Sequence, residues 1–150
     1  MAGIELSSSA FGDHAVIPRH YALEGENVSP PLTWSGVPDG TAELVLLCED
    51  PDAPSGTFVH WVVVGVDPRS TGVEPGGGPP GGRELVNGYG RRGWGGPHPP
   101  PGDDAHRYFF RLYALGEPCV LPDAPSAGQV YEAVDEQHLA SGTLVGLYRR

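Results

Sequence analysis

Glycine and proline are concentrated in one segment of this chain, and that segment constrains the fold more than any other feature. Between Gly72 and Gly102 they fill 19 of 31 positions, against 21 of the other 119. Glycine weakens and proline interrupts regular helices and strands, so residues 72–102 are expected to form a long loop. Its first half, residues 72–86, contains a run made only of glycine and proline and is expected to be mobile. The hydrophobic core must come from the rest of the chain.

Apolar runs outside this segment are short and rich in β-branched and aromatic residues, which is typical of buried strands. The clearest runs are 44–48, 58–64, 106–115 and 144–148, with weaker edge segments at 4–6 and 16–18. Ser126 and Gln129 have capping-box spacing and predict a short helix, with Gly142 as a stop near a second helical turn. Strands and helices do not alternate. The sequence therefore predicts a mainly β fold, an antiparallel β-sandwich with short C-terminal helical segments, in one domain over residues 1–150.

The charge balance excludes several classes of partner. The formal net charge is -10, and all nine basic residues are arginine. A nucleic acid is not expected as a partner, because binding it requires cations that neutralise phosphates, and an anionic membrane surface is disfavoured for the same reason. The two cysteines suit neither a disulfide framework nor a zinc site, and neither a signal peptide nor a long apolar stretch occurs. We expect a soluble, cytoplasmic protein with no stable membrane insertion.

One literal match to a known motif and one possible set of metal ligands both fail on their context. Residues 88–93 match the glycine pattern of dinucleotide-binding loops, but the prolines that follow prevent the helix that such a loop requires. Asp50, Asp52, His60 and His106 are residue types that ligate metals. The two histidines, however, are isolated on different predicted strands and lack the spacing of a ligand pair. Neither a metal nor a cofactor is expected.

Polar side chains stand where predicted strands meet rigid loops. His60 interrupts an apolar run just after the proline-containing connection 50–54, and His106 begins a strand directly after the Gly/Pro-rich segment. The alternation of a strand places Tyr108 on the same face as His106 and Arg107 on the opposite face. We expect Arg107 to be a structural ion-pair partner there. These groups could line one polar pocket. A histidine that is satisfied within the core is the alternative for His60.

Four separate motifs occur in a specific order and spacing. They are Gly25-Glu26-Asn27-Val28-Ser29-Pro30-Pro31-Leu32-Thr33-Trp34, Asp50-Pro51-Asp52-Ala53-Pro54, Phe58-Val59-His60-Trp61, and Gly96-Pro97-His98-Pro99-Pro100-Pro101-Gly102 leading into His106-Arg107-Tyr108. With them the chain resembles the phosphatidylethanolamine-binding protein family, in its bacterial, Raf kinase inhibitor-like branch, from about Ile4 to Tyr148. The resemblance implies a β-sandwich of antiparallel sheets with a small anion pocket at one end. The pocket residues that it implies are Asp50, Asp52, Ala53, Pro54, His60, His98, Pro100, His106 and Tyr108.

Two positions depart from the pattern of bacterial members of the family. His98 stands where these relatives often have a cysteine, and Trp94 stands where a tyrosine is more usual. The rim of the pocket is therefore expected to differ in size and polarity from theirs.

The residues and the resemblance together predict a non-enzymatic protein that binds a small anionic or phosphorylated ligand. Phosphate, a carboxylate or a phosphoethanolamine-like group would suit a pocket in which histidines and a tyrosine donate hydrogen bonds and an aspartate orients an imidazole. The alternative is a hydrolase that uses His60 or His106 as a general base. Regulation of a kinase or protease partner follows from the resemblance alone, and a homodimer stays open.

Overall fold

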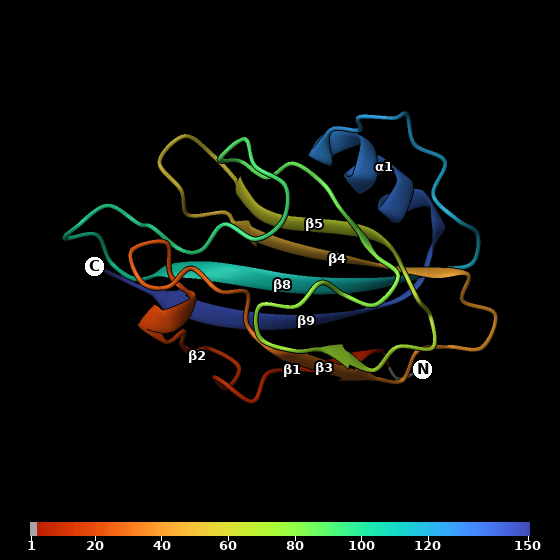
Figure 1. Ribbon diagram of the computed structural model, residues 1–150, viewed down its shortest axis with the longest axis horizontal. Helices are drawn as coiled ribbons and strands as arrows, with labels where there is room; N and C mark the ends of the chain where they lie inside the picture. The colour runs from red at the N-terminus through yellow and green to blue at the C-terminus, as the bar shows by residue number, and fades with distance from the viewer. Residues whose placement is uncertain (1–2) are drawn as a thin grey trace.

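The computed structural model describes residues 3–150 and arranges them in two β-sheets with one C-terminal helix (Figure 1). The larger sheet has the strand order β2 (Ala15–Val16), β9 (His138–Tyr148), β8 (His106–Leu115), β4 (Glu43–Asp50), β5 (Phe58–Val66) and β7 (Arg83–Glu84). The smaller sheet has the order β1 (Glu5–Ser7), β3 (Leu32–Ser35) and β6 (Gly72–Val73). The predicted mainly β fold of two sheets is confirmed. The pairing is antiparallel except between β2 and β9, which run parallel.

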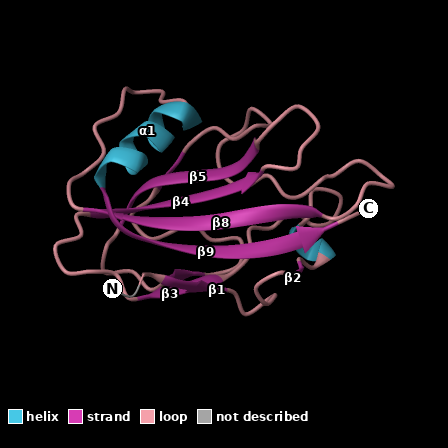
Figure 2. Ribbon diagram, turned by 180° about the vertical axis from the view of Figure 1, so that it is seen from behind, coloured by secondary structure: helices cyan, strands magenta, loops and turns pink. Residues whose placement is uncertain are grey.

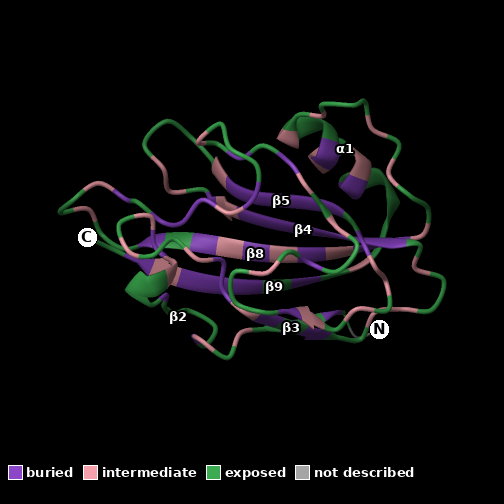
Figure 3. Cartoon of the chain, viewed as in Figure 1, coloured by how far each residue is buried: buried purple, intermediate pink, exposed green. Residues whose placement is uncertain are grey.

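The central strands β4 and β5 are buried because a hydrophobic layer covers each of their faces. One layer fills the space between the two sheets, where Leu46 and Trp61 pack in the same cluster as Trp34 of the small sheet. The other layer lies on the outer face of the large sheet, where Val62 shares a cluster with Val134 of helix α1 (Ala127–Gln137) (Figure 2). Strands covered on both faces require continuous apolar runs, and the sequence supplies them. Figure 3 shows burial concentrated along these strands and exposure in the loops.

Helix α1 begins with the predicted capping box. The Ser126 hydroxyl accepts a hydrogen bond from the Gln129 backbone N–H at 3.2 Å, and the Gln129 side chain accepts one from the Ser126 N–H at 2.9 Å. The predicted second helical turn with a stop at Gly142 is wrong, because β9 begins at His138, directly after the helix. Gly142 lies within β9, where a Cβ atom would collide with the backbone of Ile4. This glycine marks a close approach of two chain segments and not a helix end.

The antiparallel register brings the end of β4 beside the beginnings of β5 and β8. Asp50 pairs with Phe58 across β4 and β5, and β4 pairs on its other side with β8. On β8, His106 and Tyr108 are buried on the inner face, and Arg107 is exposed on the outer face. The predicted alternation on this strand is therefore correct. Polar groups from three strands meet at one end of the sandwich.

The Gly/Pro-rich segment 72–102 is not a loop throughout, because β6 and β7 lie within it and extend the small and the large sheet. Its later part passes close to the N-terminal segment. The Gly96 N–H donates to Asn27 Oδ1 at 2.8 Å, and the Leu23 N–H donates to the Pro97 carbonyl at 3.0 Å. A Cβ atom on Gly96 would collide with the Tyr21 carbonyl, so only glycine fits there. The expected mobility of residues 72–86 stays a prediction.

Candidate functional site

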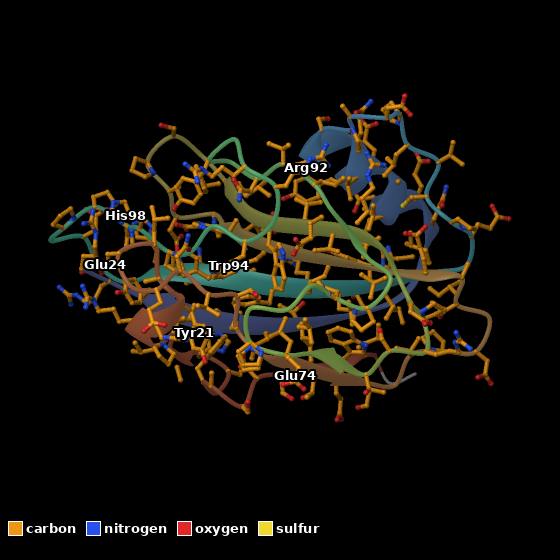
Figure 4. The ribbon with its side chains drawn as sticks, in the orientation of Figure 1. Tyr21, Glu24, Glu74, Arg92, Trp94 and His98 are labelled. Atoms are coloured by element: carbon orange, nitrogen blue, oxygen red, sulfur yellow. The ribbon has the colours of Figure 1, made fainter. Side chains whose placement is uncertain are left out.

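A cavity of about 180 Å³ opens where β4 ends and β5 and β8 begin. Its wall combines three histidines, two tyrosines and a phenylalanine with one carboxylate and a proline-rich rim. The lining residues are Asp50, Ala53, Pro54, Phe58, His60, Tyr89, His98, Pro99, Pro100, His106 and Tyr108. Eight of the nine pocket residues implied by the resemblance thus lie around one space. Figure 4 shows His98 on the loop at this end of the molecule, where its side chain is exposed.

His106 is the charged centre of the cavity, because carboxylates flank both of its ring nitrogens. Its Nδ1 lies 2.7 Å from Asp50 Oδ2, and its Nε2 lies 3.2 Å from Asp103 Oδ2. Burial alone would lower the pKa of His106. The hydrogen bonds to Asp50 and Asp103 outweigh burial and raise the pKa above its ordinary value. His106 therefore keeps its proton, and both nitrogens donate, up to a higher pH than a free histidine allows.

His60 has the opposite character. It is buried among aromatic rings, with the ring centroids of Phe58 and Tyr108 at 4.9 and 5.2 Å. Burial lowers the pKa of His60, and the Gly95 carbonyl, 2.6 Å from Nδ1, offsets this only in part. A carbonyl only accepts, so Nδ1 carries the proton of the neutral ring and Nε2 has a free lone pair. His60 thus offers the cavity an acceptor, in place of the donor expected from the sequence.

Tyr108 presents an unused hydroxyl at this site. Its side chain is fully buried, and among residues 3–150 its oxygen is the only buried side-chain N or O atom without a hydrogen-bond partner. Burial raises the pKa of Tyr108 far above its ordinary value, and the negative charge of Asp50 adds to the effect. The neighbouring Tyr89 differs, because its hydroxyl donates to the Gly96 carbonyl at 2.8 Å. Tyr108 is therefore a neutral O–H donor with no acceptor in the described part of the chain.

Asp52 is the pocket residue implied by the resemblance that the structure places elsewhere. Its carboxylate receives hydrogen bonds from the Arg107 backbone N–H and Nε, both at 2.9 Å, and from Nη2 at 2.8 Å. These bonds lower the pKa of Asp52 to about 2. Asp52 contributes to the cavity indirectly, because its backbone N–H donates to Asp50 Oδ1 at 2.8 Å. The predicted ion-pair role of Arg107 is what removes Asp52 from the cavity wall.

Three wall residues were missed from the sequence: Phe58, Tyr89 and Pro99. Phe58 stands two residues before His60 on a strand, so the alternation of side chains could have placed it on the same wall. Tyr89 lies within the glycine motif that was dismissed as a nucleotide loop. Its place on the wall depends on a fold-back of the chain, which no local pattern encodes.

Trp94 was expected at the rim, but its side chain packs against the hydrophobic core between the sheets. Its ring stacks on Phe110 with centroids 5.9 Å apart, and its Nε1–H donates to the Tyr21 carbonyl at 3.1 Å (Figure 4). Trp94 is not on the cavity wall. The departure from the family pattern at this position therefore affects packing and not the shape of the opening.

The described residues contain no cluster of three or more His, Cys, Asp or Glu side chains arranged to hold a metal ion. Asp50 and His106 bond to each other, and Asp52 bonds to Arg107. The expectations of no metal and no cofactor stay predictions. In residues 3–150 no helix is long and apolar enough to cross a membrane.

The two-sheet fold and the histidine-lined cavity at its end define the class of protein: a β-sandwich of the phosphatidylethanolamine-binding type. The sequence profile of the family "Phosphatidylethanolamine-binding protein" matches residues 7–149. The chain belongs to this family, as the resemblance predicted.

Relatives and solved structures place the chain among the microbial members of the family. A UPF0098 protein of Methanothermobacter thermautotrophicus is 45% identical, and the alignment covers 98% of this chain and 99% of that protein. A Mycobacterium tuberculosis protein named "Putative lipoprotein LppC" is 41% identical, over 97% of this chain and 72% of its own length. The crystal structure of Escherichia coli YbcL, described as a new member of the mammalian PEBP family, superposes with a TM-score of 0.92 at 29% identity, covering 99% of both chains.

Proposed function

We propose that this protein binds a small oxyanion in the cavity, such as phosphate, a carboxylate or the phosphate of a phosphoethanolamine-like group, and does not convert it. The Tyr108 hydroxyl is the observation that carries this proposal. A buried polar group without a partner costs about 1–3 kcal/mol, and an acceptor oxygen from a ligand would remove that cost. Retaining an unpaired phenol on a cavity wall is consistent with a ligand that supplies the acceptor.

The remaining polar groups define the hydrogen-bonding complement of such a ligand. The raised pKa of His106 favours its charged form, although both of its N–H groups already meet carboxylates. Tyr108 donates, and the free Nε2 of neutral His60 accepts. A ligand with acceptor oxygens and one retained proton, such as a singly protonated phosphate group, would satisfy all three. The wall has neither arginine nor lysine, and its volume is below the roughly 300–1,000 Å³ of pockets for drug-sized ligands. Both features favour a small group of low charge.

The hydrolase alternative depends on the Asp50–His106 pair, which has the geometry of an oriented general base. The raised pKa of His106 works against this role, because a protonated imidazole has no lone pair to accept a proton. Among the described residues, the cavity wall has no serine, threonine or cysteine to serve as a nucleophile. A turnover screen on phosphoesters and carboxylic esters separates the two functions. Regulation of a kinase or protease, the homodimer and the cytoplasmic location stay predictions.

Calorimetric titration with inorganic phosphate and with O-phosphoethanolamine tests the proposal. Tyr108→Phe should weaken binding by about 10- to 150-fold, because a hydrogen bond to a charged group contributes about 1.5–3 kcal/mol. Its folding stability should not fall, since the lost hydroxyl has no partner within the protein. Tyr113→Phe is the matched control, because Tyr113 lies on the same strand with its side chain on the opposite face. Equal affinities of the wild type and Tyr108→Phe would contradict the proposal.

A further inference from the structure

The two carboxylates that flank His106 are held very differently. The Asp50 side chain is 4% exposed, and its second oxygen accepts from the Asp52 backbone N–H. The Asp103 side chain is 44% exposed and reaches His106 from the loop that follows the proline-rich rim. Within residues 3–150, the Asp103 carboxylate has His106 as its hydrogen-bond partner and no cation of another residue. Asp50 is a fixed partner of the imidazole, whereas Asp103 can leave.

Asp103 occupies the one N–H of His106 that Asp50 leaves free. The Nδ1–H points to Asp50, so an anion that accepts a hydrogen bond from His106 must use Nε2. Asp103 does not line the cavity wall, but its carboxylate already accepts from that nitrogen. A carboxylate tethered three residues away is present at high effective concentration, and a free anion must outcompete it.

We infer that Asp103 is an internal competitor for the ligand: its carboxylate holds His106 Nε2 until an external anion displaces it. This inference rests on the proposed function, because it concerns how tightly the same site binds. The Asp103 side chain is partly exposed and lies on the loop before β8, so a change of its side-chain rotamer releases His106 while β8 and Asp50 stay in place. The competition lowers affinity without altering the groups that contact the ligand.

Asp103 also places a negative charge beside the cavity, so competition must be separated from simple repulsion. Asp104 provides the control. It is the next residue, it is exposed, and among the described residues its carboxylate makes neither a hydrogen bond nor an ion pair. Asp103→Asn and Asp104→Asn remove the same charge from adjacent positions, but only Asp103→Asn weakens a contact with His106. Asp103→Ala removes the residual amide contact as well.

The probe is sulfate, whose charge is constant over the relevant pH range, followed by NMR titration at about pH 5.5 and ionic strength near 0.15 M. This pH favours the charged imidazole, because the pKa of His106 is raised above its ordinary value and the variants keep the hydrogen bond to Asp50. We expect Asp103→Asn and Asp103→Ala to bind sulfate about two- to fivefold more tightly than the wild type, the range expected for a partly exposed ion pair. Asp104→Asn should change affinity by less than about 1.5-fold, because solvent screens its charge.

An imidazole titration gives a second readout that general loop damage would not produce. Asp50 and Asp103 bond to the ring of His106, and the charges of Asp52 and His60 couple to it without a hydrogen bond. Asp103→Asn should lower the pKa of His106, and Asp104→Asn should leave it unchanged. Equal sulfate affinities of the wild type and Asp103→Asn, or equal gains in Asp103→Asn and Asp104→Asn, would overturn the inference and leave the proposed function standing. Failure of every one of these proteins to bind sulfate or phosphate would overturn both.

Discussion

His60 on β5 and His106 on β8 face the same cavity but prefer opposite protonation states. On the aromatic side, which comprises Phe58, His60, Tyr89 and Tyr108, burial lowers the pKa of His60, and the ring has a backbone carbonyl as its hydrogen-bond partner. On the carboxylate side, which comprises Asp50, Asp103 and His106, the two acids raise the pKa of His106. Both rings have almost no solvent exposure and burial lowers the pKa of each, but only at His106 do hydrogen bonds to carboxylates outweigh this effect.

This comparison shows that partners decide what a buried histidine can do. A carbonyl can only accept, so it fixes one tautomer of a neutral ring, whereas a carboxylate also stabilises the positive charge. The cavity wall therefore combines a histidine whose charged form is favoured with one whose neutral form is favoured. Two protonated histidines would attract an anion more strongly, but neither could accept a hydrogen bond from it.

The largest expected effect tests the carboxylate side. Asp50→Ala should lower the free energy of unfolding by about 3 kcal/mol, because it leaves His106 without its buried partner. The same substitution at Asp103 should cost less than about 1 kcal/mol, because that side chain is partly exposed and solvent screens the pair. Urea unfolding of both variants at neutral pH provides the measurement. Similar losses for the two would mean that they are not held as differently as the structure indicates.

A smaller effect is expected in the pH dependence of stability, with opposite signs on the two sides. The stabilisation from His106 should be complete below about pH 6.5 and lost as the pH rises through its raised pKa. The stabilisation from neutral His60 should be complete above about pH 6.5 and lost as the pH falls through its lowered pKa. Subtracting the free energy of unfolding of His106→Gln or His60→Gln from that of the wild type, between about pH 5 and pH 8, isolates each contribution.

The stability lost in His106→Gln should shrink as the pH rises, and the stability lost in His60→Gln should grow. Histidine NMR titrations of the wild type provide the independent check on both assignments. Parallel pH profiles of the two variants would refute the contrast between the two sides.

The smallest expected effect concerns the outer face. Arg107→Gln should lower stability by less than about 1 kcal/mol, because the guanidinium is half exposed. It should leave the affinity for inorganic phosphate within about twofold, since neither Arg107 nor Asp52 lines the cavity. Calorimetry and urea unfolding on one preparation measure both quantities. A large loss of affinity would show that Asp52, once released from Arg107, disturbs Asp50 through its backbone hydrogen bond.

Local sequence patterns were enough to predict the strands that build the site and the faces they present. Continuous apolar runs identified β4 and β5, because strands buried on both faces have apolar residues at successive positions. Alternation on β8 assigned His106 and Tyr108 to the inner face, because successive side chains of a strand point to opposite faces. The helix start at Ser126 was equally local, since a capping box involves residues three apart. The motifs that carry the family resemblance supplied the other wall residues except Phe58, Tyr89 and Pro99.

The roles of those residues depend on contacts between distant parts of the chain. The tautomer of His60 depends on a carbonyl 35 residues away, and the charge of His106 depends on Asp50, 56 residues away. Asp52 left the predicted pocket because Arg107, on the outer face of β8, binds its carboxylate. Gly142 proved to be a strand residue because β9 pairs with β8 there, opposite Leu112. Periodicity in the sequence predicts the face of the sheet on which a side chain lies. The partner of that side chain depends on strand register and on the path of the loops, and a short stretch of sequence encodes neither.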